Sequence, residues 1–147
     1  MRSSSTPRRR SSSPAGPRPN LPRTFEYSAS LDGDGTLLAD GSPLRPDEAW
    51  TPEHFVLAGL MRCTLQSLRH HAEQAAVTVG GSAVAEAVVT KRDDGRYGFV
   101  EIECGLDIAL DPPVEGTALS KLLALAERDC FVGASLTPSP RYEWRVN

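Results

Sequence analysis

The pattern of hydrophobic and polar residues is clearest in the middle of the chain, between residues 51 and 76. Hydrophobic side chains recur there at three- and four-residue spacing, as in a helix with one buried face. Thr51 can cap this helix, Pro52 has no amide hydrogen to lose in the first turn, and Glu53 complements the positive helix end. The recurring residues are Val56, Leu57, Leu60, Met61, Leu65 and Leu68. We therefore predict one long helix that ends near Ala75.

Segments with the alternating or continuous hydrophobic pattern of strands lie on both sides of this helix. They are residues 24–33, 36–39, 84–91, 97–110 and 140–146. Turn signals at 32–35 and 93–95 predict two hairpins. A second helix is predicted over 115–128, and 41–50 is predicted to be a loop. The order of strands, helix, strands, helix and strand indicates an α+β fold.

The first 22 residues differ from the rest in composition, because they are mostly Ser, Pro and Arg. Such a segment cannot bury enough surface to offset the entropy lost on ordering. We predict a disordered tail over residues 1–22 and one folded domain over residues 23–147. Residues 1–25 hold six of the 16 basic residues and no acid, so 10 basic residues face 19 acidic ones beyond them. This net charge of −9 argues against nucleic acid as the main partner.

Other classes of protein are excluded by what the sequence lacks. No hydrophobic run reaches the roughly 18 to 20 residues that cross a bilayer, and no hydrophobic segment of a secretory signal follows the basic start. We therefore predict a soluble protein of the cytoplasm. Three cysteines are too few for a disulfide scaffold, and in a reducing compartment cysteines that matter are more often catalytic. The histidine and glycine spacings predict no metal and no nucleotide cofactor.

Two segments that contain cysteine carry the most specific pattern. The first is T-P-E-H-F-V-L-A-G-L-M-R-C, in which Cys63 follows Glu53 by ten residues, and the second is A-E-R-D-C-F-V-G-A-S-L around Cys130. These motifs, in this order, resemble the signature of the OsmC/Ohr family over about residues 24–147. The resemblance implies antiparallel sheets, long central helices and an intertwined homodimer.

The same resemblance implies a thiol peroxidase without a cofactor. In that chemistry the Cys63 thiolate attacks an organic hydroperoxide, releases an alcohol and becomes a sulfenic acid. Cys130 then condenses with it to form a disulfide, which an external dithiol reduces. In the Ohr branch this reductant is a lipoylated protein. Glu53 is implied to pair with an arginine that contacts the reactive cysteine.

The arginine is the point at which this chain departs from the pattern. Ohr proteins carry it in an early turn, but the matching turn here, residues 31–35, has none. OsmC proteins carry it in the loop before the Pro-Glu pair, so Arg45 is the candidate and Arg62 is the second choice. Ten residues of helix rise about 15 Å, so Glu53 cannot reach Cys63 directly. An arginine, a helix break or a second subunit must complete the site.

Each of these residues also has a structural interpretation. A cysteine on a helix rich in Leu and Met is usually inert, and Cys130 fits a buried helix end. Glu53 stabilises a helix start by up to about 1 kcal/mol through the helix dipole alone, and Arg45 fits a solvated loop charge. The alternative function is a protein of this fold that binds a small apolar molecule or has a structural role, without useful turnover. Cys104 alternates in the predicted strand with Val100, Ile102, Leu106 and Ile108, so it shares their hydrophobic face and is predicted to lie in the core.

Overall fold

The chain divides into two compact units, with the boundary between Arg45 and Pro46. The computed structural model describes residues 22–147. Residues 1–21 lie outside the described residues, so the tail predicted over residues 1–22 and the single domain predicted over residues 23–147 stay predictions. The two units are considered separately.

The first unit contains a small antiparallel sheet in the order β1-β2-β3, with β1 at Ala29–Leu31, β2 at Leu37–Ala39 and β3 at Ser42–Leu44. The prediction of a loop after residue 40 was wrong for β3. The reason is the pair Asp40 and Gly41, whose φ angles of 51° and 79° form the tight two-residue turn that joins antiparallel strands. The strand predicted over residues 24–33 is limited to three residues in β1.

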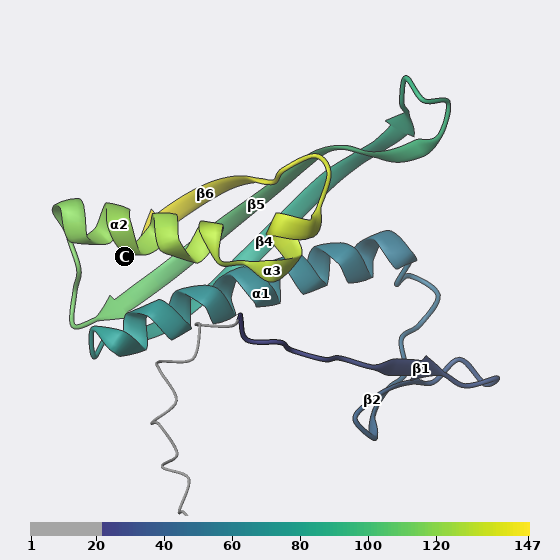
Figure 1. Cartoon of the computed structure of the whole chain (residues 1–147), viewed down its shortest axis with the longest axis horizontal. Helices are drawn as coiled ribbons and strands as arrows, with labels where there is room; N and C mark the ends of the chain where they lie inside the picture. Colours follow the sequence, from purple (N-terminus) through teal and green to yellow (C-terminus); the bar gives the residue numbers. More distant parts are fainter. Residues whose placement is uncertain (1–21) are drawn as a thin grey trace, which may run out of the picture. The chain divides into compact units, whose positions relative to one another are not determined.

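The second unit contains three helices and three strands (Figure 1). They are α1 at Pro52–Gln74, β4 at Thr78–Lys91, β5 at Tyr97–Asp111, α2 at Gly116–Arg128, α3 at Phe131–Ser135 and β6 at Arg141–Val146. The predicted long helix, long hairpin, second helix and last strand are confirmed, whereas α3 was not predicted. The sheet order is β4-β5-β6, with an antiparallel pair β4–β5 and a parallel pair β5–β6.

The start of α1 follows the predicted capping pattern. The Thr51 hydroxyl accepts a hydrogen bond from the His54 amide, and the His54 ring accepts one from the Thr51 amide. The helix ends where Ala76 takes a positive φ of 56° and the Val77 amide returns to the Ala72 carbonyl. One continuous helix therefore connects Glu53 to the region of Cys63.

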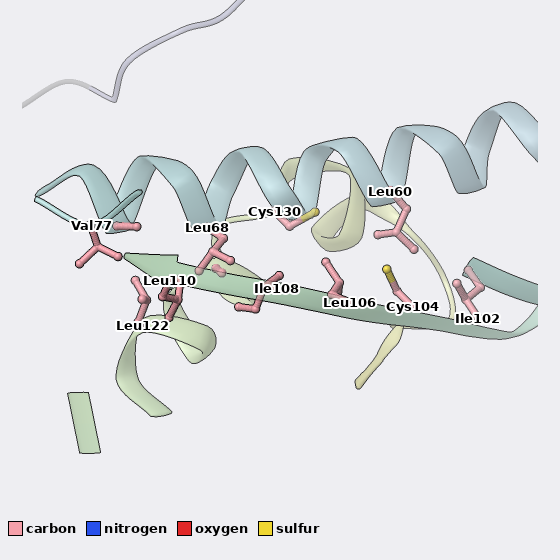
Figure 2. Packing of buried hydrophobic residues seen from close by; sticks show 12 residues of the cluster. Leu60, Leu68, Val77, Ile102, Cys104, Leu106, Ile108, Leu110, Leu122 and Cys130 are labelled. Atoms are coloured by element: carbon pink, nitrogen blue, oxygen red, sulfur yellow. The ribbon is translucent and has the colours of Figure 1, made fainter. Parts of the chain in front are cut away.

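The core lies between α1, α2 and the facing side of β5, as Figure 2 shows. Alternate side chains of β5 point into it, because successive residues of a strand face opposite sides. These are Ile102, Cys104, Leu106, Ile108 and Leu110. They pack against Leu60 and Leu68 of α1 and Leu122 of α2. Cys104 is fully buried, and this burial raises the pKa of its thiol to about 11, as expected for a core cysteine.

A glycine in β4 allows the two long strands to approach closely. Gly81 lies opposite Ile108 and has a φ of 155°, and a Cβ atom there would overlap the Asp107 carbonyl oxygen. The neighbouring Gly80 has open space at the same position. Of these two positions, only residue 81 must be a glycine for the strands to approach this closely.

No helix within residues 22–147 is long and apolar enough to span a bilayer.

Candidate functional site

Cys63 lies on α1, on the side of the helix that borders the core. Its side chain is half-buried and packs against the buried cluster, and its thiol is free. The next residue, Thr64, is fully buried and lies in phase with Leu60 and Leu68, one helical turn away in each direction. Cys63 therefore stands at the edge of the buried face, where an external molecule can still approach it.

Cys130 is the residue that caps the short helix α3. It is fully buried and free, and its Sγ accepts a hydrogen bond from the Gly133 amide at 3.3 Å. The same sulfur lies 3.4 Å from Oγ1 of Thr64 on α1. Cys130 is therefore held against the helix that carries Cys63, directly beside the neighbour of that residue.

The two thiols of Cys63 and Cys130 interact with each other. Burial raises the pKa of Cys63 most, while hydrogen bonds from the backbone amides of Val132 and Phe131 lower it. A hydrogen bond and electrostatic repulsion with Cys130 raise the pKa of Cys63 further. The Gly133 amide of α3 thus donates to Cys130, and the backbone of the two preceding residues acts on the pKa of Cys63.

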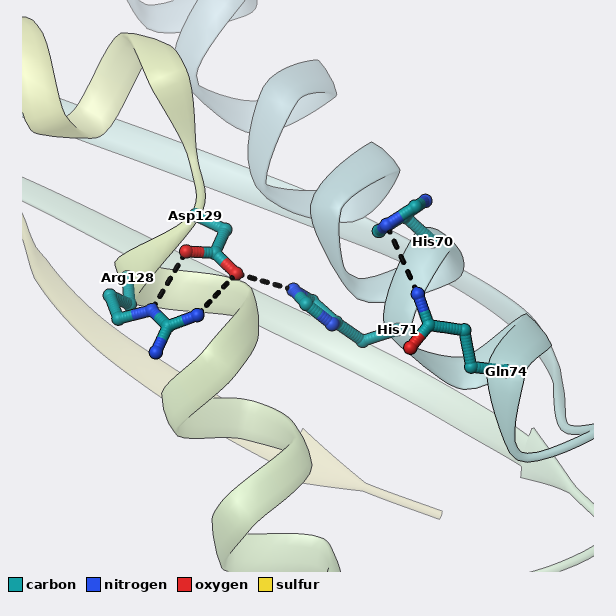
Figure 3. A network of polar contacts seen from close by, with 5 residues as sticks. All are labelled: His70, His71, Gln74, Arg128 and Asp129. Atoms are coloured by element: carbon teal, nitrogen blue, oxygen red, sulfur yellow. Dashed lines mark hydrogen bonds and ion pairs between the residues drawn. The ribbon is translucent and has the colours of Figure 1, made fainter. Parts of the chain in front are cut away.

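The segment that carries Cys130 is fixed to α1 by a polar contact, shown in Figure 3. Nε2 of His71 lies 2.8 Å from Oδ2 of Asp129, the residue before Cys130. Asp129 also accepts two hydrogen bonds from Arg128, and that contact is the main cause of the lowered pKa of Asp129. The contact between α1 and the end of α2 helps to hold Cys130 in place.

Glu53 lies at the exposed start of α1. Its own backbone amide, followed by the Thr51 side chain, lowers the pKa of Glu53. Because α1 is continuous from Pro52 to Gln74, Glu53 and Cys63 are separated by about 15 Å of helical rise. The structure of this chain does not bring Glu53 to Cys63.

Arg45 ends the first unit and binds the early turn of that unit. Its Nη2 donates to Asp34 Oδ2 at 2.6 Å, and its Nη2 and Nε donate to Thr36 Oγ1 at 3.0 and 3.2 Å. A hydrogen bond from the Thr36 amide, the largest cause, and the contact with Arg45 lower the pKa of Asp34. Arg45 therefore lies against the early turn at residues 31–35, which contains no arginine of its own. Arg62, the second candidate, is exposed on α1.

In each of the two units, residues that make polar contacts with the candidate residues were missed from the sequence. Thr64 and Asp34 had a usable signal: Thr64 is a polar residue in a buried hydrophobic stripe, and Asp34 is an acid in the turn expected to meet an arginine. His71 had none, because its partner Asp129 lies far away in the sequence. Among residues 22–147, no group of three His, Cys, Asp or Glu side chains is arranged to hold a metal ion.

The fold and the site together define the class of protein. It is an α+β protein with two free thiols, one on a long helix and one that caps a short helix and contacts the long helix through Thr64. The chain belongs to the OsmC-like protein family, whose family model matches residues 45–145. The comparison with curated proteins gives no match.

Solved structures have the same fold at low sequence identity. An OsmC-like protein of unknown function from Vibrio cholerae has a TM-score of 0.67 at 18% identity, over 84% of this chain and 100% of that one. An organic hydroperoxide resistance protein, OsmC, from Legionella pneumophila has a TM-score of 0.58 at 16% identity, over 86% and 99%. A further Vibrio cholerae protein, solved with captopril bound in one of its active sites, has a TM-score of 0.60 at 16% identity, over 87% and 95%. These similarities confirm the predicted OsmC/Ohr-like fold with its long helices and antiparallel pairs.

Proposed function

We propose that this chain is a cysteine-based peroxidase that reduces organic hydroperoxides to alcohols, with Cys63 as nucleophile and Cys130 as resolving thiol. The observation that carries the proposal is that the Cys130 sulfur lies 3.4 Å from Oγ1 of Thr64, the residue next to Cys63, in a chain of the OsmC-like family with both thiols free. Of the three cysteines only Cys63 is partly exposed, whereas Cys104 and Cys130 are fully buried.

The oxidative half of the reaction needs only the two thiols and a hydroperoxide, ROOH. The Cys63 thiolate attacks one peroxide oxygen, the O–O bond breaks, and the alcohol ROH leaves after taking up a proton. The sulfenic acid of Cys63 then condenses with the Cys130 thiol, which forms the S–S bond and releases water. An external dithiol reduces this disulfide and is itself oxidised. The amides of Phe131 and Val132 favour the reactive form, because they lower the pKa of Cys63.

An apolar environment favours alkyl or fatty-acid hydroperoxides over hydrogen peroxide. Leu57 and Met61 of α1 and Val132 of α3 are partly buried against the core on the elements that carry the two thiols. A substrate with an alkyl chain would bury apolar surface there, which hydrogen peroxide cannot do. This supports the organic class of substrate.

A homodimer and a cytoplasmic location complete the proposal. Large hydrophobic residues of the second unit are exposed in the single chain, among them Trp50, Val84, Val88 and Phe131. A second copy would cover such surface and would bring another Glu53 into the assembly, which supports a site built from two chains. A reducing cytoplasm would keep the thiols ready for reaction, with a lipoylated protein as the candidate dithiol.

Arg45 is the cation that we assign to Cys63, and the assignment predicts a pH effect. Burial raises the pKa of Cys63, and a guanidinium nearby would lower it, so removal of the cation should reduce the thiolate fraction at neutral pH. Arg45→Met should therefore slow iodoacetamide alkylation of Cys63 about tenfold at pH 7 and move the rise in rate to higher pH. The measurement is the alkylation rate from pH 5 to 10, with Arg62→Met as the matched control. Superimposable curves for Arg45→Met and the unchanged protein would remove Arg45 from the site.

The experiment that tests the proposed function is mass spectrometry of the intact protein after one equivalent of cumene hydroperoxide, with peptide mapping. We expect a loss of two hydrogens that maps to a Cys63–Cys130 disulfide. Thiols that stay reduced at a large excess of hydroperoxide would contradict the proposal.

The second candidate function is binding of a small apolar molecule without turnover. The observation that favours it is the net raised pKa of Cys63, since a protonated thiol is a poor nucleophile. Unreactive thiols in the mass experiment, together with saturable binding of an alkyl probe, would support this alternative.

A further inference from the structure

The hydrogen bonds around Cys130 have a definite direction. Thr64 has one hydroxyl hydrogen, and it is donated to the Leu60 carbonyl at 2.8 Å. In the 3.4 Å contact with Cys130, the Thr64 oxygen is therefore the acceptor and the Cys130 S–H group is the donor. The Gly133 amide donates to the same sulfur at 3.3 Å. The reduced Cys130 side chain thus donates to Thr64 and accepts from the Gly133 amide.

The hydroxyl group of Tyr142 is the third polar group next to Cys130. Tyr142 lies on β6, opposite Cys104 of β5. Its hydroxyl comes so close to Gly133 that a Cβ atom there would overlap the oxygen, and that Cβ atom would also lie 3.3 Å from the sulfur of Cys130. Burial is the main cause that raises the pKa of Tyr142; Cys130 raises it further, and Thr64 lowers it. We call Thr64, Gly133 and Tyr142 the Cys130 seat.

The Cys130 seat is polar although the surroundings are not. Leu60, Leu68 and Cys104 around it are fully buried. Polar groups in such a place cost free energy unless they are paired, and here the Thr64 hydroxyl and the Gly133 amide both pair with the Cys130 sulfur. Ser67, on the same helix, is a contrast, because its buried hydroxyl has no partner within the described residues. Three chain segments thus converge on Cys130: α1, the start of α3 and β6.

We infer that Thr64 and Tyr142 are positioning residues for Cys130, which hold its thiol beside Cys63 so that the oxidised Cys63 is resolved before a second oxidant molecule reaches it. The inference rests on the proposed function, but it concerns only the resolving step. In that step the Cys130 sulfur bonds to the Cys63 sulfur and the S–O bond of the sulfenic acid breaks. The hydroxide that leaves takes the Cys130 proton and becomes water. If resolution is slow, a second hydroperoxide oxidises Cys63 to sulfinic acid.

The test measures how Cys63 partitions between disulfide and sulfinic acid. Thr64→Val keeps the shape and removes the acceptor, Tyr142→Phe removes only the hydroxyl, and Thr64→Ser restores an acceptor. Under excess cumene hydroperoxide, the ratio of disulfide to sulfinic acid should fall about five- to tenfold in Thr64→Val and Tyr142→Phe, as expected for the loss of one hydrogen bond. The rate of the first oxidation of Cys63 should not change. Thr64→Ser and the control Ser67→Ala should behave like the unchanged protein.

A second arm with oxidised glutathione tests the same step without a peroxide. The Cys63 thiolate displaces glutathione to form a mixed disulfide, and Cys130 then displaces the second glutathione to form the Cys63–Cys130 bond. The mixed disulfide should persist about five- to tenfold longer in Thr64→Val and Tyr142→Phe.

The outcomes of the two arms separate the inference from the proposed function. Slow resolution in the glutathione arm, together with no reaction with hydroperoxide, would support the Cys130 seat and overturn the peroxidase. An unchanged ratio of disulfide to sulfinic acid in Tyr142→Phe and Thr64→Val would overturn the inference. Equally slow disulfide formation in the control Ser67→Ala would also overturn it, as would absence of the Cys63–Cys130 disulfide in both arms. If Thr64→Val does not fold, Tyr142→Phe decides the question.

Discussion

Replacement of Cys63 by serine is expected to abolish consumption of cumene hydroperoxide and to leave the fold intact. The thiolate attacks the peroxide, and a serine hydroxyl stays protonated at neutral pH and is a far weaker nucleophile. Because Cys63 lies at the edge of the core and is only half-buried, exchange of sulfur for oxygen should cost little stability. The measurement is hydroperoxide loss with dithiothreitol as reductant, with circular dichroism to check the fold.

The matched control for this variant is Cys104→Ala. Cys104 is fully buried in the core, so this change should cost about 1 kcal/mol of stability through lost packing but should keep turnover. Retained turnover in Cys63→Ser would assign the nucleophile to another residue. Loss of turnover in both variants with unchanged circular dichroism would indicate that Cys104 takes part in the chemistry.

The largest expected effect on stability is that of Gly81→Ala. The Cβ atom of alanine would overlap the Asp107 carbonyl oxygen, and a φ of 155° is strained for any residue with a side chain. Neither the backbone of β5 nor that of β4 can yield without loss of ladder hydrogen bonds. We expect destabilisation by about 2 to 4 kcal/mol, seen as a fall of roughly 10 °C in Tm by circular dichroism.

Gly80→Ala provides the control in the same strand. A Cβ atom at Gly80 meets no atom within 4 Å, so the change should alter stability by less than about 1 kcal/mol. Equal falls in Tm for the two variants would show that the strand, rather than the close approach at Gly81, is sensitive to alanine.

The sequence predicted those parts of the fold that depend on local signals. Thr51 and Pro52 marked the start of α1, and the turn at residues 93–95 marked the hairpin of β4 and β5. The parallel pairing of β6 with β5 could not be predicted, because strand pairing depends on contacts between distant segments. The helix α3 is five residues long, too short for a hydrophobic period. The turn at Asp40 and Gly41 carried a usable signal, and the loop prediction there was wrong.

The candidate site was predicted in its residue types and not in its geometry. Cys63 and Cys130 were identified from two separate motifs, but only the fold places Cys130 against Thr64, the residue next to Cys63. Thr64 was overlooked although a hydroxyl in a leucine stripe requires a partner when buried. Arg45 was chosen by its position before the Pro-Glu pair, and its anchorage on Asp34 depends on the turn between β2 and β3.

Cys130 caps α3, so the order of this helix should depend on whether Cys130 is reduced or oxidised. In the reduced protein the sulfur of Cys130 accepts the Gly133 amide and so closes the first turn of this helix. A bond to Cys63 would redirect that sulfur and leave the turn without its cap, which weakens a helix start by about 1 kcal/mol. The oxidised protein would then present a looser segment at Phe131, an exposed aromatic residue next to the disulfide. A reductase could therefore distinguish spent molecules from ready ones by shape, before any exchange of sulfur atoms.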